Sequence, residues 1–415
     1  MRLRDTIKAQ PGLSSLVLHG LGLVIRLGFM LAILRWSGST LLGVFGLLVA
    51  IEMVIVYLCG LEFHTFTTRR YARRPCRTML RLCAASHFQL LTVCAPLAVL
   101  VAVTVALVLR LHLSATELVL LGTIVATGML SNEVGRFMVL TNRPLHSVTM
   151  TFIRTAGWQP LLLTYLGTNE ELTALLALWA LASLLSVSWA LWIMREALGS
   201  AVRPRFRYLV RGLALSRTYY LIASASVLQS NLDRFVLQMM LGPTAVGIFT
   251  FFQTLANTLP ALVQSAVLNV WLPQLLGAFG RQTPNRMELL SRVGRRSWAI
   301  GIGLSAAIGL TALPLVWLTS HPEYLGWLWI LPLLLAAQIL IVGSQPLHLA
   351  IYAAHKDISL MWLALGSLAC GIVISVTLVS NLGLVGAAIA SPCSALLLWI
   401  GRRWLFKFLS ANNQI

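Results

Sequence analysis

Twelve apolar segments, each near twenty residues long, recur along the 415-residue sequence. They cover residues 13–34, 41–63, 83–109, 115–140, 147–166, 172–194, 218–241, 246–271, 298–318, 325–352, 358–379 and 383–405. About 20 apolar residues let one helix cross the hydrocarbon core of a bilayer. Only 10% of the residues are charged, whereas soluble domains carry about 25%. The pattern predicts an all-α, polytopic membrane protein with twelve transmembrane helices.

The basic residues gather in the loops on one side of these helices. Of the 31 Lys and Arg residues, 26 lie on one side, where they occupy the N-terminal region, alternate loops and the adjoining segment ends, and the C-terminal end of the last segment and the residues after it. The opposite loops contain only Arg35 and Arg110. Basic loops stay on the cytoplasmic side of a membrane. Both termini are therefore predicted to be cytoplasmic. The net charge of +19 is then a topology signal and indicates no nucleic-acid partner.

Polar side chains interrupt two neighbouring apolar segments. Segment 218–241 carries Gln229, Ser230, Asn231, Asp233, Arg234 and Gln238. Segment 246–271 carries Gln253, Asn257, Pro260 and Gln264, whose spacings of 4, 3 and 4 residues place them on one helical face. Polar groups within a membrane face the protein interior or a water-filled cavity. We expect Asn231, Gln253 and Asn257 to line such a cavity.

The two halves of the chain contain an internal repeat. Gly38, Leu42, Gly43, Val44 and Phe45 match Gly242, Val246, Gly247, Ile248 and Phe249 at an offset of 204 residues. An even number of helices in each half makes the halves parallel repeats, related by an axis along the membrane normal. A basic loop at 196–217 separates them. We predict an N-terminal six-helix lobe at 1–205 and a C-terminal six-helix lobe at 206–415.

Three arginines, Arg26, Arg154 and Arg234, lie within apolar segments and do not belong to the basic residues gathered on one side. Arg26 shares a helical stripe with Ser15, His19 and Gly22, and Arg154 shares one with Thr151, Thr155 and Trp158. Arg234 lies one turn beyond the position that the repeat aligns with Arg26. An arginine at the centre of a membrane helix costs roughly 2.5 to 3.5 kcal/mol, so each needs a partner or a function. The structural alternatives are ion pairs with Glu52, Glu62, Glu133 or Asp233, or snorkelling to an interface.

Two acids are candidates for ion coupling. Glu52 and Asp233 flank the arginine stripes and have no obvious fixed partner in the sequence. A carboxylate within the membrane can bind a proton or a sodium ion during transport. The alternative for Glu52 is a salt bridge to Arg26 or Arg234.

The remaining ionisable residues indicate no enzyme chemistry. Glu62 and Glu133 are expected to be structural, and His19 is either a lumenal ligand or a packing residue. The six cysteines have no paired spacing, so neither disulfides nor a metal site is predicted. With only three lysines, the chain has no GxxxxGK[ST] motif, and it has no HExxH motif. We predict no enzyme, no cofactor and no metal.

These residues carry a family resemblance. The sequence NLDRFVLQMMLGPTAVGIFTFFQTL at 231–255 is echoed in the first half by LRWSGSTLLGVFGLLVAIE at 34–52 and CGLEF at 59–63. With its twelve segments in two halves, the chain resembles a polysaccharide (Wzx-type) flippase of the multidrug/oligosaccharidyl-lipid/polysaccharide exporter superfamily. The resemblance implies a V-shaped bundle that works by alternating access on a lipid-linked saccharide. It also implies a cationic lumen, in which the cations would be Arg26, Arg154 and Arg234.

The predicted function is therefore that of a flippase in a bacterial inner membrane. Its substrate would be a polyprenyl-pyrophosphate-linked oligosaccharide, the repeat unit of an O-antigen or exopolysaccharide. The three arginines would bind the pyrophosphate, because a guanidinium group grips phosphate bidentately and stays charged. The expected partners are this substrate, membrane lipids, a polysaccharide polymerase and a chain-length regulator.

Three other functions remain open at this stage. A multidrug or cation antiporter of the same superfamily would want acids in its lumen, and the three arginines argue against it. A membrane glycosyltransferase or O-antigen polymerase generally needs a sizeable outer loop, whereas predicted outer loops such as 167–171 and 320–324 are short. A channel or scaffold is also compatible with the sequence.

Overall fold

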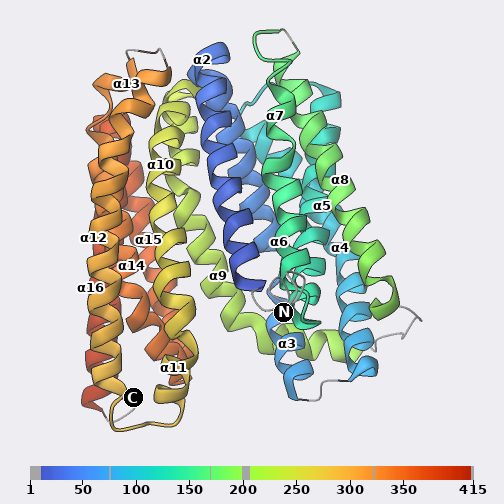
Figure 1. Cartoon of the computed structure of the whole chain (residues 1–415), viewed down its shortest axis with the longest axis vertical. Helices are drawn as coiled ribbons and strands as arrows, with labels where there is room; N and C mark the ends of the chain where they lie inside the picture. Colours follow the sequence, from blue (N-terminus) through green and yellow to red (C-terminus); the bar gives the residue numbers. More distant parts are fainter. Residues whose placement is uncertain are drawn as a thin grey trace, which may run out of the picture. The chain divides into compact units, whose positions relative to one another are not determined.

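A computed structural model describes residues 11–73, 76–168, 170–198, 206–319, 321 and 323–412 of the chain. The backbone of these residues forms helices and turns, without a strand. In chain order the helices are α2 (Pro11–Gly60), α3 (Phe63–Arg73), α4 (Arg77–Val108), α5 (Ala115–Leu140), α6 (Pro144–Phe152), η1 (Ile153–Gly157), α7 (Gln159–Leu162), α8 (Glu171–Leu198), α9 (Phe206–Leu241), α10 (Pro243–Val263), η2 (Gln264–Leu268), α11 (Asn269–Gly280), α12 (Arg286–Thr319), α13 (Glu323–Gly326), α14 (Ile330–Ala353), α15 (Asp357–Leu382) and α16 (Leu384–Ala411) (Figure 1). The predicted all-α class is confirmed.

The count of twelve membrane helices is not confirmed. In the described part of the chain, nine helices are long and apolar enough to span a membrane. Segments 13–34 and 41–63 join in the single helix α2, because the residues between them continue the helix past a kink. Segment 147–166 is divided among α6, η1 and α7. Helix α9, which covers segment 218–241, is absent from the nine.

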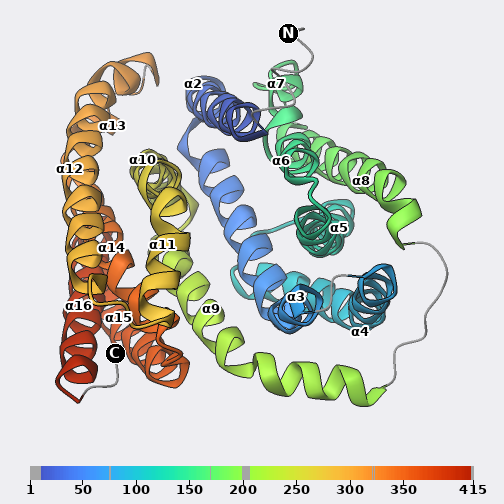
Figure 2. The ribbon, with the colours of Figure 1, turned by 60° about the horizontal axis from the view of Figure 1, so that its bottom comes forward.

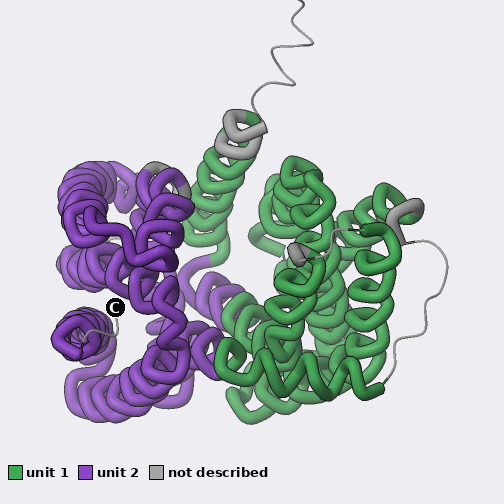
Figure 3. The backbone as a smooth tube through the Cα atoms, turned by 90° about the horizontal axis from the view of Figure 1, so that it is seen from below, with its two compact units in different colours: residues 1–37, 48–220 green, residues 38–47, 221–415 purple. Residues whose placement is uncertain are grey.

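The chain folds into two compact units (Figure 3). Unit 1 contains residues 1–37 and 48–220, and unit 2 contains residues 38–47 and 221–415. Helices α2 and α9 therefore contribute residues to both units. The predicted lobes, residues 1–205 and 206–415, describe the internal repeat. The two compact units do not test them, so they remain a prediction.

Each unit is a bundle of packed helices. In unit 1, α5 packs against α4, α6 and α8 (Figure 2). The hydrophobic core between these helices contains the buried side chains of Cys83, Phe137, Met138, Met150 and Met194. In unit 2, α14 packs against α10, α12 and α16.

The sequence repeat recurs in the backbone and contacts of unit 2. Gly38 (φ 82°, ψ −174°) and Gly242 (φ 84°, ψ −177°) share one conformation, and positive φ values of this kind favour glycine. Five residues further on, Gly43 and Gly247 face each other. A Cβ on Gly43 would overlap the backbone carbonyl of Pro243, and a Cβ on Gly247 would overlap that of residue 39. The two glycines let the helices approach to backbone contact.

Substitution of Gly247 by alanine should destabilise this packing. The added methyl meets a backbone carbonyl that cannot rotate away, and overpacking of this kind costs about 3 kcal/mol. Gly28→Ala is the matched control, because Gly28 is helical and a Cβ there has no neighbour within 4 Å. Alanine in place of a helical glycine should stabilise by about 1 kcal/mol. Melting temperatures in detergent should fall for Gly247→Ala and hold or rise for Gly28→Ala. Equal melting temperatures would contradict the close contact.

Candidate functional site

In unit 1, the two predicted stripes of α2 and segment 147–166 meet. The Arg26 Nη2 of α2 donates a hydrogen bond of 2.5 Å to Oγ1 of Thr155. Thr155 and Arg154 both lie in η1, a π-helical turn within an otherwise α-helical segment. Single π-turns inside membrane or soluble helices often occur at functional sites, because the extra residue changes which side chains face inward. Here the turn presents Arg154 and Thr155 to α2.

Arg154 is neutralised by a carboxylate. Its Nη1 lies 2.5 Å from Oε1 of Glu52, which is 6% exposed. Gly128 of α5 makes room for this pair, since a Cβ there would lie 2.5 Å from the Glu52 Oε1 atom and 3.3 Å from Arg154 Nη1. The salt-bridge alternative for Glu52 is confirmed, but its partner is Arg154 in place of Arg26 or Arg234.

Arg26 keeps its charge. Its hydrogen-bond partner is a neutral hydroxyl, and no carboxylate of the described residues lies within 4 Å of it. The turn beside it is held by Trp158, whose Nε1 donates to the Arg154 carbonyl at 3.0 Å and whose ring meets Phe29 edge-on at 5.5 Å. His19, predicted on the same stripe, is exposed. The side chain of Ser15 lies outside the described residues.

In unit 2, Arg234 is a second guanidinium group with neutral partners. It is 7% exposed, and its Nε donates to Oε1 of Gln253 at 2.8 Å. Its Nη1 lies 3.4 Å from the carbonyl of Gly46 and 3.5 Å from Oδ1 of Asn231. Among the described side chains no carboxylate pairs with it at 4 Å or less. The predicted amides Asn231 and Gln253 therefore hold the arginine in place.

Other amides of unit 2 pair between helices. Gln338 Nε2 of α14 donates to Oδ1 of Asn257 on α10 at 2.9 Å, and Asn257 is exposed. Gln229 of α9 bonds Ser367 of α15 at 3.1 Å. Asn257 thus has one fixed amide partner and a side chain that remains accessible.

Asp233 is bound by two hydroxyls. Ser375 of α15 donates to its Oδ1 at 2.9 Å, and Ser391 of α16 donates to its Oδ2 at 2.8 Å. The expectation that Asp233 lacks a fixed partner is therefore wrong. Its partners lie 142 and 158 residues away in the sequence, so no local pattern could identify them. Both partners are neutral hydroxyl groups.

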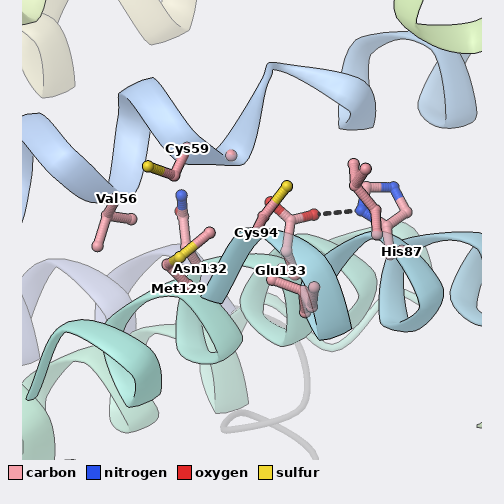
Figure 4. A pocket seen from close by; sticks show the side chains of 10 residues that line it. Val56, Cys59, His87, Cys94, Met129, Asn132 and Glu133 are labelled. Atoms are coloured by element: carbon pink, nitrogen blue, oxygen red, sulfur yellow. Dashed lines mark ion pairs between the residues drawn. The ribbon is translucent and has the colours of Figure 1, made fainter. Parts of the chain in front are cut away.

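Glu133 belongs to a separate buried network near a pocket of unit 1 (Figure 4). It lies 2.6 Å from His87 Nδ1 and 2.9 Å from Arg136, which in turn lies 3.7 Å from Glu62. The pocket between α2, α4 and α5 is also lined by Cys59, Cys94, Met129 and Asn132. In the part of the chain that the structure describes, no group of three His, Cys, Asp or Glu side chains is placed to hold a metal ion. These contacts agree with structural roles for Glu62 and Glu133.

His64 joins this network from α3, outside the membrane-spanning helices. Its Nδ1 lies 3.1 Å from Glu62 Oε2. Burial lowers the pKa of His64 to about 3 and raises the pKa of Glu62. His64 is therefore neutral at pH 7, so its contact with Glu62 is not an ion pair.

Sequence patterns missed one buried arginine. Arg402 belongs to the basic residues assigned to a cytoplasmic loop, yet in α16 it is 8% exposed. Its Nη1 donates to the hydroxyl of Ser344 on α14 at 2.6 Å. The pairing depends on the packing of α14 against α16, which leaves no local signal in the sequence.

Comparisons with known proteins give the fold of the chain. No protein-family model matches the sequence, and no curated protein matches it. Among solved structures, an inward-facing multidrug resistance MATE family transporter of the MOP superfamily has a TM-score of 0.69 at 14% identity, covering 93% of this chain and 95% of that chain. The lipid II flippase MurJ in an inward closed conformation has a TM-score of 0.76 at 10% identity, covering 95% and 87%. A MOP superfamily transporter from Pyrococcus furiosus Vc1 (DSM3638) has a TM-score of 0.62 at 13% identity, covering 96% and 94%.

These TM-scores show a shared fold. The chain has the helical fold of MOP-superfamily transporters, over nearly its full length. Together with its apolar helices, this fold indicates a multi-pass membrane protein.

Proposed function

We propose that the chain is a transporter that flips a polyprenyl-pyrophosphate-linked oligosaccharide across the bacterial inner membrane by alternating access. One observation carries the proposal: Arg26 and Arg234, on membrane helices of units 1 and 2, hydrogen-bond only neutral acceptors among the described residues. A guanidinium group in such a site attracts a phosphate oxygen pair and stays charged throughout transport. The fold shared with a lipid II flippase supports a lipid-linked substrate.

The structure supports different roles for the three predicted arginines. Arg26 in unit 1 and Arg234 in unit 2 would each be able to bind a phosphate group, since neither has a carboxylate partner among the described residues. Arg154, paired with Glu52, would mainly hold η1 so that Thr155 meets Arg26. The accessible amide of Asn257 is suited to hydrogen bonds with sugar hydroxyls.

The charge of the substrate supplies a driving force. A pyrophosphate diester carries about two negative charges, and each is worth ~2.3 kcal/mol per 100 mV of membrane potential. A negative cytoplasm therefore favours outward movement of the loaded carrier. Binding of a proton or sodium ion would mainly reset the empty carrier. A polysaccharide polymerase and a chain-length regulator are the partners that would receive the product.

A proteoliposome experiment separates this function from the multidrug alternative, which the MATE fold also supports. Purified protein would be reconstituted with a lipid-linked oligosaccharide in one set of vesicles and a cationic dye in another. The proposal expects movement of the lipid-linked sugar to the opposite leaflet and no transport of the dye. Transport of the dye alone would establish the antiporter, and movement of neither substrate would contradict both functions.

Asp233 is the acid that the contacts favour for ion coupling. If it binds the resetting ion, Asp233→Asn should still exchange lipid-linked sugar across the membrane, because exchange needs only the loaded carrier. Net transport under an imposed proton or sodium gradient should be lost. The asparagine can still accept a bond from one serine, so the melting temperature should change little. Net transport at the parental rate would rule out the coupling role, as would equal loss of exchange and net transport in a destabilised protein.

A further inference from the structure

Helix α3 and the first part of α9, residues 206–220, pack together in unit 1 through aromatic side chains. Phe66 of α3 lies 5.1 Å from the ring of Tyr208. Gly212 of α9 fits against Phe63 and Phe66, and a Cβ at Gly212 would clash with both rings. This part of α9 runs past α3 in Figure 2. The two helices thus form one continuous surface.

An arginine connects the same two helices. Arg69 of α3 donates from Nη2 to the hydroxyl of Tyr219 at 2.8 Å, and its guanidinium carbon lies 4.7 Å above the Tyr219 ring. A hydrogen bond combined with a cation–π contact orients both side chains. The side chains of Arg69 and its neighbour Arg70 are exposed.

The outward face of α9 is both apolar and basic. Phe206 is 74% exposed and Val210 is 50% exposed, while Arg207 and Arg211 beside them are exposed too. At about 100° per residue, Phe206 and Val210 lie about 40° apart on the helix, and the two arginines form the neighbouring strip. Apolar side chains next to arginines are typical of helices that lie in a membrane interface.

The charge of this surface has one sign. Residues 63–73 and 206–220 contain six arginines and no Asp or Glu. Clusters of four to eight basic residues beside a membrane helix attract anionic lipid head groups. A soluble acidic protein would satisfy the charge but would leave Phe206 and Val210 without an apolar environment.

We propose that α3 and residues 206–220 form a binding surface for anionic phospholipid head groups, with Phe206 and Val210 among the acyl chains and Arg69, Arg70, Arg207 and Arg211 at the phosphates. This α3–α9 surface is separate from Arg26 and Arg234. Since α9 continues from residue 221 into unit 2, lipid bound here holds the end of a helix that both units share.

Native mass spectrometry of the full-length protein in detergent tests the surface. The parent would be titrated with phosphatidylglycerol and, separately, with phosphatidylcholine of the same acyl chains. We expect tighter binding of phosphatidylglycerol, weakened by added salt. Arg207→Gln/Arg211→Gln should weaken phosphatidylglycerol binding about 30-fold and leave phosphatidylcholine binding unchanged. Inorganic phosphate at the same concentration should not displace the lipid, because it lacks acyl chains.

Arg295→Gln/Arg296→Gln is the control, since it removes two exposed arginines of α12. It should bind phosphatidylglycerol like the parent. Phe206→Ser/Val210→Ser keeps the charge and should weaken binding of both lipids. Equal affinity of the parent for the two lipids, an equal loss in the control pair, or displacement by inorganic phosphate would overturn the proposal. The assay requires no transport, so its result is independent of the proposed function.

Discussion

Replacement of Arg154 by methionine should destabilise the protein more than any other single change at the candidate site. The substitution leaves Glu52, which is 6% exposed, without its partner at 2.5 Å. An uncompensated buried charge costs about 3 to 5 kcal/mol. The melting temperature in detergent should fall by several degrees, and the yield of folded protein should fall with it.

The double variant Glu52→Gln/Arg154→Met shows whether the loss of stability comes from the unpaired charge or from the change in side-chain volume. It removes both charges, so it should recover most of the lost stability, because neutral replacement of a buried ion pair is often nearly neutral. Arg26→Met is a second control: its partner is the neutral Thr155 hydroxyl, and its loss leaves no unpaired carboxylate. If Arg26→Met and Arg154→Met lower the melting temperature equally, the Glu52 pair has no special role in stability.

Loss of either unneutralised arginine should abolish transport of the lipid-linked sugar. Arg26→Ala and Arg234→Ala each remove two or more charge-assisted hydrogen bonds to phosphate, worth about 1.5 to 3 kcal/mol apiece. The transport rate at equal protein levels should fall about 100-fold or more. Lysine at either position keeps the charge but lacks the planar fork, so Arg26→Lys and Arg234→Lys should retain part of the activity. Exposed Arg295 provides the control substitution.

Gln253 offers a sharper test of the charge at Arg234. Gln253→Glu has nearly the same shape and places a carboxylate at the atom that now accepts the 2.8 Å bond from Arg234 Nε. The pair would neutralise the arginine without removing it. Transport should therefore be lost while the protein stays folded. Parental transport by Gln253→Glu, or by both alanine variants, would remove these arginines from the substrate site.

Local patterns in the sequence were sufficient for the helices and for the faces that carry polar groups. Hydropathy over about twenty residues depends only on neighbours along the chain, so the segment 115–140 coincides with α5. Helical spacing likewise placed Arg26 and Thr155 on inward stripes, and these stripes meet. The repeat offset of 204 residues predicted equivalent positions for Gly38 and Gly242, which share one backbone conformation.

The partners of the charged groups were decided by tertiary structure alone. Spacing along one helix tells which face a side chain occupies, but not which face of another helix opposes it. Arg154 of η1 pairs with Glu52 of α2. Packing of α9 against α15 and α16 brings two serines to Asp233. These contacts pair Arg154 with a carboxylate and give Arg26 and Arg234 neutral partners among the described residues. The contacts of Arg26, Arg154 and Asp233 join residues more than a hundred positions apart. The acceptor of Arg234 lies on another helix. No local pattern in the sequence encodes such contacts.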